Sequence, residues 1–240
     1  MENIGASIIQ RAIEKDKQEQ YTMALVLYQE GLQVLIESIK EMKDPTRKKH
    51  FQTRTAEYMD RAERIKSLIE EKKSKGKYRE HMKIENGAIG YGYHSVFGRF
   101  LDCTVTEIRV EEPYIRAAHQ CQNFVRFCEL TVTKCLELSK IILTTTSDPN
   151  DKAGQISRLD ELKTSLANKL VTLEVKFSDT LHDRQITLSN GWIIKIGRGL
   201  DYFSPPKGKF VLGYNDLELR ACRETVVDIF HQSQLQDNIK

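Results

Sequence analysis

The chain has 240 residues, of which 40% are hydrophobic and 30% charged, and its net charge is +3. These values are ordinary for a globular protein with one large or two small domains, and the charge is too small to indicate nucleic-acid binding by itself. No apolar run approaches the roughly 20 residues that cross a bilayer, and the usage of cysteine described next leads us to expect a cytoplasmic protein.

The five cysteines contain no Cys-x-x-Cys pair and are odd in number, which argues against a disulfide framework. Cys121, Cys128 and Cys135 recur every seven residues in one predicted helix, so we expect them to be small core residues. Histidines at metal-binding spacing are absent around them. We therefore expect no metal and no cofactor.

The N-terminal third predicts three amphipathic helices. The first covers about residues 7–17, and the second carries an apolar stripe from Tyr21 to Ile39. Asp44-Pro45 ends the second helix because proline has no backbone N–H. The third helix covers about 46–73. Its predicted core positions are Phe51, Thr55, Tyr58, Ala62, Ile65 and Ile69. Short connections make such helices antiparallel neighbours, so we expect an antiparallel three-helix bundle over residues 1–75.

Near its end, the third helix also carries a stripe in which apolar and acidic residues lie side by side. Met59 and Ala62 are small or flexible apolar residues, and Asp60 and Glu63 are acids beside them. Because residues three and four apart are neighbours on a helix surface, this stripe can receive a partner helix that carries leucines and basic residues. The alternative is that Glu63 is an ordinary solvated acid and Met59 a peripheral core residue.

Three motifs make a resemblance to a known family specific. They are Arg11-Ala12-Ile13-Glu14-x-Asp16, Tyr21-x-x-Ala24-Leu25-x-x-Tyr28-x-x-Gly31-Leu32 and Tyr58-Met59-Asp60-Arg61-Ala62-Glu63. Together they resemble the MIT (microtubule-interacting and trafficking) domain, whose members bind C-terminal tail helices of ESCRT-III subunits, the filament-forming proteins that constrict membrane necks. The resemblance implies that a tail helix lies between the second and third helices. Its leucines would then contact Met59 and Ala62, and its basic residues Asp60 and Glu63.

Residues 76–86 form a basic, weakly patterned segment that we interpret as a linker. The basic run starts earlier, at residue 70, and over 70–83 we expect it to be helical at first and to loosen at Gly76. In the alternative interpretation its cations help to bring the protein to an anionic membrane, where each Lys or Arg adds about 1 kcal/mol. The glycines at 87, 90 and 92 fit no phosphate-binding loop, and we place the start of a second domain, residues 87–240, there.

In the second domain, strand-like segments alternate with helical ones. We expect strands at 105–110, 141–144, 170–177, 192–196 and 210–212, and helices at 117–135, 156–166 and 224–231. This order predicts a parallel or mixed sheet covered by helices. The fold class is therefore a multidomain one, with a three-helix bundle followed by a mixed α/β domain.

One group of residues in this domain is a candidate for catalysis or phosphate binding. His182-Asp183-Arg184 resembles a degenerate form of the phospholipase D signature, His-x-Lys-x-x-x-x-Asp, with Arg184 at the lysine position and Ser189 at the aspartate position. In that superfamily one His attacks phosphorus and a second protonates the leaving group. Here only a dimer partner could supply the second His. We expect phosphate or lipid-headgroup binding instead of catalysis; a structural His within a turn is the other alternative.

Basic residues follow this motif, interleaved with aromatic ones. Lys195, Arg198, Lys207 and Lys209 join Arg184 as candidate lipid-binding cations. The same mixture suits single-stranded nucleic acid, which we do not expect as a partner. Strand alternation places Trp192 inward and Lys195 outward.

Taken together, the two resemblances are to proteins that join an MIT domain to a phospholipase-D-like domain. They imply a homodimeric, non-enzymatic adaptor that ESCRT-III tails recruit to the midbody during cytokinetic abscission. Its second domain would bind phosphoinositide-containing membrane peripherally, there or on late endosomes. The competing hypothesis is a dimeric phosphodiesterase that acts on lipid or nucleic acid through His182 and Arg184.

Overall fold

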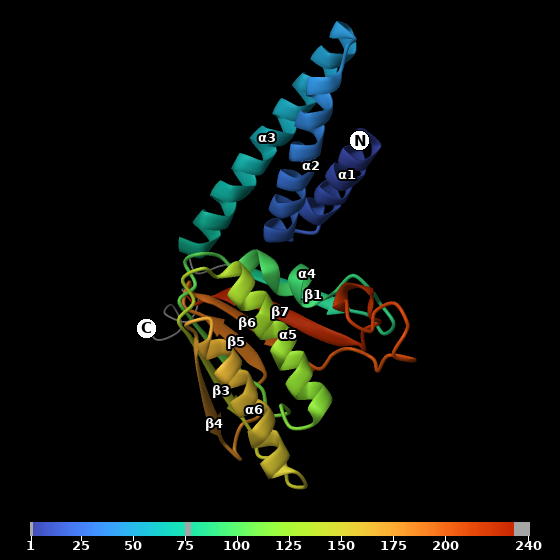
Figure 1. Ribbon diagram of the computed structural model, residues 1–240. Coiled ribbons are helices and arrows are strands. Elements are labelled where there is room, and N and C mark those ends of the chain that lie inside the picture. The colour runs from blue at the N-terminus through green and yellow to red at the C-terminus, as the bar shows by residue number, and fades with distance from the viewer. Residues whose placement is uncertain (1, 75–77, 233–240) are drawn as a thin grey trace. The chain divides into compact units, whose positions relative to one another are not determined.

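The computed structural model describes residues 2–74 and 78–232 (Figure 1). The chain divides into two compact units, with the boundary between Glu80 and His81. The expected loosening at Gly76 lies outside the described residues, as do the outer ends of both expected domains.

The first unit is the predicted three-helix bundle, formed by α1 (Glu2–Lys17), α2 (Tyr21–Glu41) and α3 (Pro45–Ser74). The central helix α2 packs against both α1 and α3. Gly31 allows the close approach of α1, because a Cβ at this position would lie 2.8 Å from the Ile9 side chain. The buried residues of α3 are Thr55, Ala62, Ile65 and Ile69, so the predicted core side of this helix is confirmed there.

The second unit is built on a mixed seven-stranded sheet. Its strands are β1 (Arg79–Ile84), β2 (Glu107–Glu111), β3 (Lys140–Thr145), β4 (Thr172–Phe177), β5 (Gln185–Leu188), β6 (Trp192–Ile196) and β7 (Thr225–His231), in the spatial order β1-β7-β6-β5-β2-β3-β4. Strands β2, β3 and β4 are parallel, and the pairs β2–β5, β5–β6 and β6–β7 are antiparallel. This confirms the predicted α/β class.

Helices connect the parallel strands. α5 (Ala118–Lys134) follows β2, and α6 (Lys152–Ala167) follows β3. Both lie on the same face of the sheet, as right-handed crossovers require (Figure 1). The short α4 (Tyr93–Phe97) packs beside α5, and two 3-10 turns, η1 (Gly98–Phe100) and η2 (Leu217–Leu219), complete the unit within the described residues.

Three segments were predicted with the wrong structure, and two elements, β5 and the short α4, were not predicted. The supposed linker contains β1, whose exposed side chains alternate with buried ones, so its cations are one face of a strand. Residues 224–231 form β7 and not a helix, because the β-branched and aromatic residues from Thr225 to His231 alternate between buried and partly exposed positions. Residues 210–212 form no strand; they lie in a loop, where all three side chains are exposed.

Aromatic residues fill the core beside α4. Tyr93 lies 5.4 Å from Phe203 and 6.2 Å from Phe127 between ring centroids, and Tyr202 is fully buried with them. Trp192 is also buried, 4.8 Å from the Phe100 ring. Tyr202 and Phe203 are therefore core residues, and the predicted burial of Trp192 and exposure of Lys195 are confirmed. Cys121, Cys128 and Cys135 are buried as expected.

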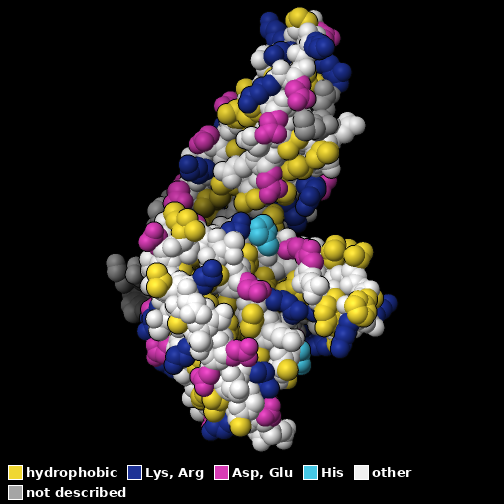
Figure 2. All heavy atoms as spheres, viewed as in Figure 1, with side chains coloured by type: hydrophobic (Ala, Val, Ile, Leu, Met, Phe, Trp, Pro, Cys, Tyr) yellow, Lys and Arg dark blue, Asp and Glu magenta, His cyan; other side chains and the backbone are white. Residues whose placement is uncertain are grey.

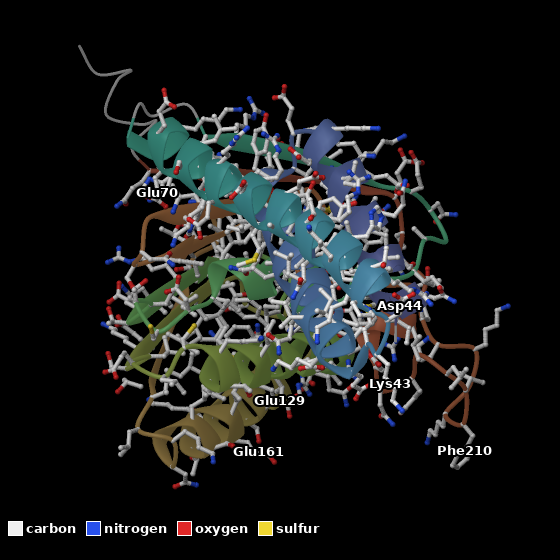
Figure 3. The ribbon with its side chains drawn as sticks, turned by 90° about the horizontal axis from the view of Figure 1, so that it is seen from above. Lys43, Asp44, Glu70, Glu129, Glu161 and Phe210 are labelled. Atoms are coloured by element: carbon white, nitrogen blue, oxygen red, sulfur yellow. The ribbon has the colours of Figure 1, made fainter. Side chains whose placement is uncertain are left out.

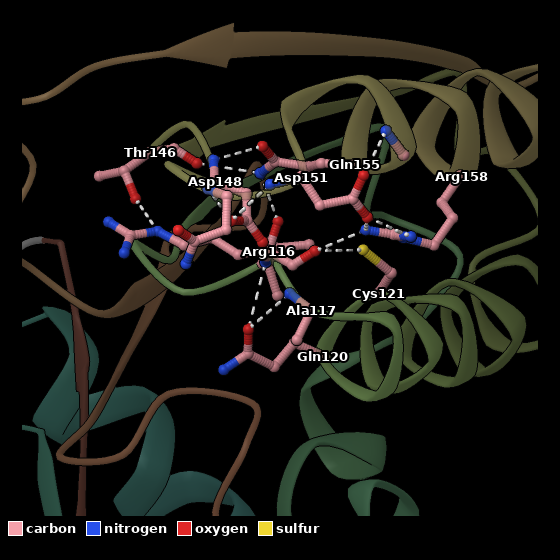
Figure 4. Close-up of polar contacts among 12 residues, drawn as sticks. Arg116, Ala117, Gln120, Cys121, Thr146, Asp148, Asp151, Gln155 and Arg158 are labelled. Atoms are coloured by element: carbon pink, nitrogen blue, oxygen red, sulfur yellow. Dashed lines mark hydrogen bonds and ion pairs between the residues drawn. The ribbon is translucent and has the colours of Figure 1, made fainter.

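A polar network fixes the starts of α5 and α6 (Figure 4). Buried Gln155 donates to the carbonyl oxygens of Ile115 and Thr146 at 2.7 and 2.9 Å and accepts from the Asp148 N–H at 2.8 Å. The Asp151 carboxylate accepts from the Gly154 N–H and caps α6. This network positions the loops that follow β2 and β3.

Within the two described stretches, no helix is long and apolar enough to cross a bilayer. The same stretches contain no group of three His, Cys, Asp or Glu residues arranged to hold a metal ion.

Candidate functional site

The first candidate site is the exposed face of α3. Met59 is 49% exposed, and Asp60 and Glu63 are exposed beside it. Within the described part of the chain, neither carboxylate has an ion-pair or hydrogen-bond partner. An apolar side chain next to unpaired acids offers a basic amphipathic helix both of the contacts that it needs.

Ala62 occupies a different position from its three neighbours in the motif. Its side chain is 7% exposed and lies on the core side of α3 with Ile65. Met59 therefore offers the larger apolar surface, and contact between Ala62 and a partner leucine stays a prediction.

Cross-helix contacts hold α3 in place around this face. The Arg61 guanidinium donates two hydrogen bonds to the Asp16 carboxylate of α1, at 2.7 and 2.8 Å, and these bonds raise the pKa of Arg61. The Tyr28 ring of α2 lies 6.4 Å from the Tyr58 ring. The motif residues Asp16, Tyr28 and Arg61 thus have a structural role, and they support the face that Met59 presents.

The second candidate site lies at one edge of the sheet. Strands β2 and β6 end there, at Glu111 and Ile196, and β5 and β7 begin there, because Glu111 pairs with Gln185 and Ile196 with Val227. In open α/β sheets ligands bind outside the carboxyl ends of parallel strands. Residues just beyond these strand ends are therefore well placed to hold a ligand.

Arg184 and Glu112 form the inner part of this edge. Arg184 donates to the Gly197 carbonyl oxygen at 2.6 Å, and its Nε, 3.8 Å from a Glu112 oxygen, is buried without a hydrogen bond. Glu112 accepts N–H bonds from Tyr114 and Leu200. Burial nevertheless raises the pKa of Glu112 to about 7, against the opposing effect of these bonds and of Arg184.

Two adjoining hollows open at this edge, and we call them the arginine hollows. The first, of about 470 Å³, is lined by Arg184, Arg198 and Arg223. The second, of about 420 Å³, is lined by Arg126, Arg220 and again Arg223. Both include Asp201 and the first also includes Glu224, so arginines outnumber acids in each hollow. A ligand that fits this lining is an anion.

Several of the guanidinium donors remain available to such an anion. Arg223 has no side-chain hydrogen bond or ion pair within the described residues. Arg126 donates only through one Nη, to Asn123 at 3.0 Å. Arg220 is anchored by the carbonyl oxygens of Gly213 and Tyr214, while burial and the charge of Arg126 lower its pKa. A bound anion would relieve the repulsion between these cations.

The structure brings together only some of the predicted lipid-binding cations. Arg184 and Arg198 line the first hollow. Lys195 is exposed on β6 opposite Asp228 in the strand register and lines neither hollow. Lys207 and Lys209 are exposed on the loop that follows the second hollow's wall.

The residues of the phospholipase-D-like signature are dispersed. His182 is exposed in the connection from β4 to β5 and does not line the hollow that contains Arg184. The Ser189 hydroxyl accepts N–H bonds from Thr106 and Glu107, and Asn190 donates to the Phe100 carbonyl oxygen. Ser189 therefore stabilises the start of β2, and Asn190 binds the end of η1.

Three of the arginines were not predicted from the sequence. Arg126 lies on α5, and Arg220 and Arg223 lie between η2 and β7. No local pattern distinguishes them, because the hollow forms only when α5 packs beside the segment that precedes β7. The one local signal is Asn123, which is three residues before Arg126 and bonds both Arg126 and Asp201.

Comparisons with known proteins agree with this division of the chain. Residues 4–67 match the MIT (microtubule interacting and transport) domain, and residues 90–231 match the family described as the phospholipase D-like domain at the C-terminus of MIT. MIT domain-containing protein 1 of Mus musculus is 46% identical over 228 residues, which cover 95% of this chain and 92% of that protein.

A second relative matches a shorter part of the chain. Ribosomal protein S6 kinase delta-1 of Homo sapiens is 38% identical over 64 residues, which cover 27% of this chain and 6% of that protein. The nearly full-length match to the mouse protein and the two domain matches together show to which family the chain belongs. The chain belongs to the family of proteins in which an MIT domain is followed by a phospholipase D-like domain.

Proposed function

We propose that this chain is a non-enzymatic adaptor. Its MIT domain binds tail helices of ESCRT-III subunits, and its phospholipase D-like domain binds anionic, phosphoinositide-containing membrane. The observation that carries the proposal is that each unit presents charged groups without partners among the described residues: the Asp60 and Glu63 carboxylates on α3, and the Arg223 guanidinium in the arginine hollows.

On α3, the apolar contact supplies most of the affinity for a tail helix. An exposed ion pair contributes about 0–1 kcal/mol, so Asp60 and Glu63 mainly select a basic partner and set its direction. Met59 has half of its surface available for burial under a tail leucine. The resulting complex is weak and reversible, as recruitment to a filament requires.

In the arginine hollows, phosphate groups are the ligands that suit the side chains best. Guanidinium groups bind phosphate with paired N–H bonds, and each Lys or Arg near an anionic surface contributes about 1 kcal/mol. Phosphoinositides carry several phosphates on one headgroup and match a lining in which five arginines lie around two adjoining hollows.

Two weak contacts become effective when they act together. A homodimer formed through the second unit would present two tail-binding faces and two membrane sites, and the second contact of each kind would then be effectively intramolecular. Such an adaptor would act where ESCRT-III filaments constrict membrane, at the midbody during cytokinetic abscission, and would bind peripherally to late endosomal or other anionic membranes.

Vesicle sedimentation with turnover measured on the same samples tests the proposal. We expect the full chain to sediment with phosphoinositide vesicles and to leave phosphodiester substrates intact. Arg126→Gln with Arg223→Gln should abolish most of the binding, whereas the control Lys195→Gln should not. Hydrolysis that is lost in His182→Ala would instead support the phosphodiesterase hypothesis, and binding that is indifferent to the arginines would refute this membrane site.

A further inference from the structure

The loop of residues 204–214 presents an apolar tip to solvent. Phe210 is 102% exposed and Leu212 88%, and Val211 between them is 43% exposed. Phe210 has the largest exposed fraction of any large hydrophobic residue in the described chain. It lies at the far end of its loop, directed away from the sheet and its helices (Figure 3). Single exposed hydrophobic residues are common on protein surfaces, but contiguous ones mark interaction sites.

The stem of this loop is held in a defined conformation. Phe203 forms a β-bridge with Cys222, and the Ser204 N–H donates to the Ala221 carbonyl oxygen at 2.9 Å. At the other end, the Arg220 guanidinium binds the carbonyl oxygens of Gly213 and Tyr214. The stem therefore fixes where the tip projects.

Two lysines lie next to the apolar tip in the same loop. Lys207 and Lys209 precede it, and neither has an ion-pair partner within the described residues. Figure 2 shows hydrophobic side chains gathered beside Lys and Arg side chains over this part of the unit. The same loop forms the wall of the second arginine hollow through Ser204, Pro205, Pro206 and Tyr214. The tip and the proposed phosphate site are therefore parts of one continuous surface.

A lipid bilayer fits this surface better than a protein does. A stable protein interface buries about 800 Å² per partner, and three side chains at the end of one loop cannot supply that area. The boundary between headgroups and acyl chains accepts a small apolar group flanked by lysines, because their long side chains reach back to the phosphates. The surrounding charge selects an anionic bilayer.

We propose that Phe210, Val211 and Leu212 insert into the acyl region of an anionic membrane while Lys207, Lys209 and the arginine hollows hold phosphates above it. This inference rests on the proposed membrane contact and adds an apolar anchor to it. Because salt screens charges but leaves apolar burial intact, part of the binding persists at high ionic strength.

Vesicle binding by matched variants tests the insertion. The double variant Phe210→Ser with Leu212→Ser removes the anchor, and Leu136→Ser, which replaces a leucine that is 79% exposed on another segment, is the control. On vesicles of phosphatidylcholine, phosphatidylserine and a phosphoinositide, we expect the double variant to bind about tenfold or more weakly than the native chain. The control should bind like the native chain. A second measurement uses Phe210→Trp, whose indole fluorescence should be quenched by lipids brominated on the acyl chains.

The outcomes separate the two proposals. If the native chain does not bind the vesicles, the membrane contact and the insertion both fail. If it binds, but the double variant binds equally well and the fluorescence of the Phe210→Trp variant is not quenched, the membrane contact stands and the insertion is refuted. Loss of self-association in the double variant without vesicles, with vesicle binding retained, would assign the tip to a second copy of the chain and also refute the insertion.

Discussion

Replacing Met59 by Asp should abolish measurable binding of an ESCRT-III tail helix while the bundle stays folded. Full burial of a methionine side chain is worth about 1.5–3 kcal/mol. Because Met59 is 49% exposed in the free chain, a tail leucine can gain about half of that. An aspartate in its place would also be left against an apolar surface without a partner, at a cost of about 1–3 kcal/mol. The sum of about 2–4 kcal/mol corresponds to a loss of roughly 30-fold to 1000-fold in affinity.

The assay is a titration of a labelled tail peptide with the full chain, read by fluorescence anisotropy. Thermal unfolding serves as the folding control, and a change at a half-exposed helix position should stay within about 1 kcal/mol. Glu63→Gln is the comparison variant: it removes one exposed charge and should weaken binding by at most about fivefold. A larger loss in Glu63→Gln than in Met59→Asp would refute the reasoning that apolar contact dominates.

Three further predictions follow from the second unit. Arg223→Gln should weaken binding to anionic vesicles by about fivefold, whereas Lys195→Gln should have a smaller effect because Lys195 lines neither hollow; equal losses in sedimentation would contradict the site. Gln155→Leu should lower the free energy of unfolding by about 2–4 kcal/mol in urea titration, because it leaves two buried carbonyl oxygens and one N–H without partners, and an unchanged midpoint would show that the network is dispensable. Since burial raises the pKa of Glu112 from 4.5 to about 7, the folded chain binds a proton between these values that the unfolded chain lacks. The free energy of unfolding should therefore fall by about 3 kcal/mol at most as pH rises from 4.5 to 7, and Glu112→Gln should remove that part of the slope, whereas parallel slopes in the two proteins would disprove it.

Segments with a strong period could be predicted well from the sequence. The apolar stripe of α2 and the seven-residue spacing of the cysteines in α5 determine which side of each helix is buried. The wrong predictions concerned segments that were assigned from their residue composition and not from the periodicity of their hydrophobic residues. Cations on alternate positions of β1 made a strand resemble a linker, and the apolar run at Phe210 resembled a strand although no partner strand exists for it within the described residues.

The two candidate sites differ in how much the sequence could predict. Met59 and Glu63 are one turn apart on a single helix, so their proximity follows from helix geometry alone. The arginine hollows combine residues from α5, from the ends of β5 and β6 and from the segment before β7. Sequence reasoning found Arg184 through a resemblance and Arg198 through the interleaving of basic and aromatic residues, but Arg126 and Arg223 come together only through tertiary packing.

Vesicle flotation with a labelled tail peptide shows whether one chain holds an ESCRT-III tail and an anionic membrane at the same time. We predict that the peptide floats with phosphoinositide vesicles only when the full chain is present. Met59→Asp should release the peptide but leave the chain on the vesicles, and Arg126→Gln with Arg223→Gln should release both. If peptide and vesicles compete for the chain, or if the chain binds only one of them, it does not link an ESCRT-III tail to a membrane.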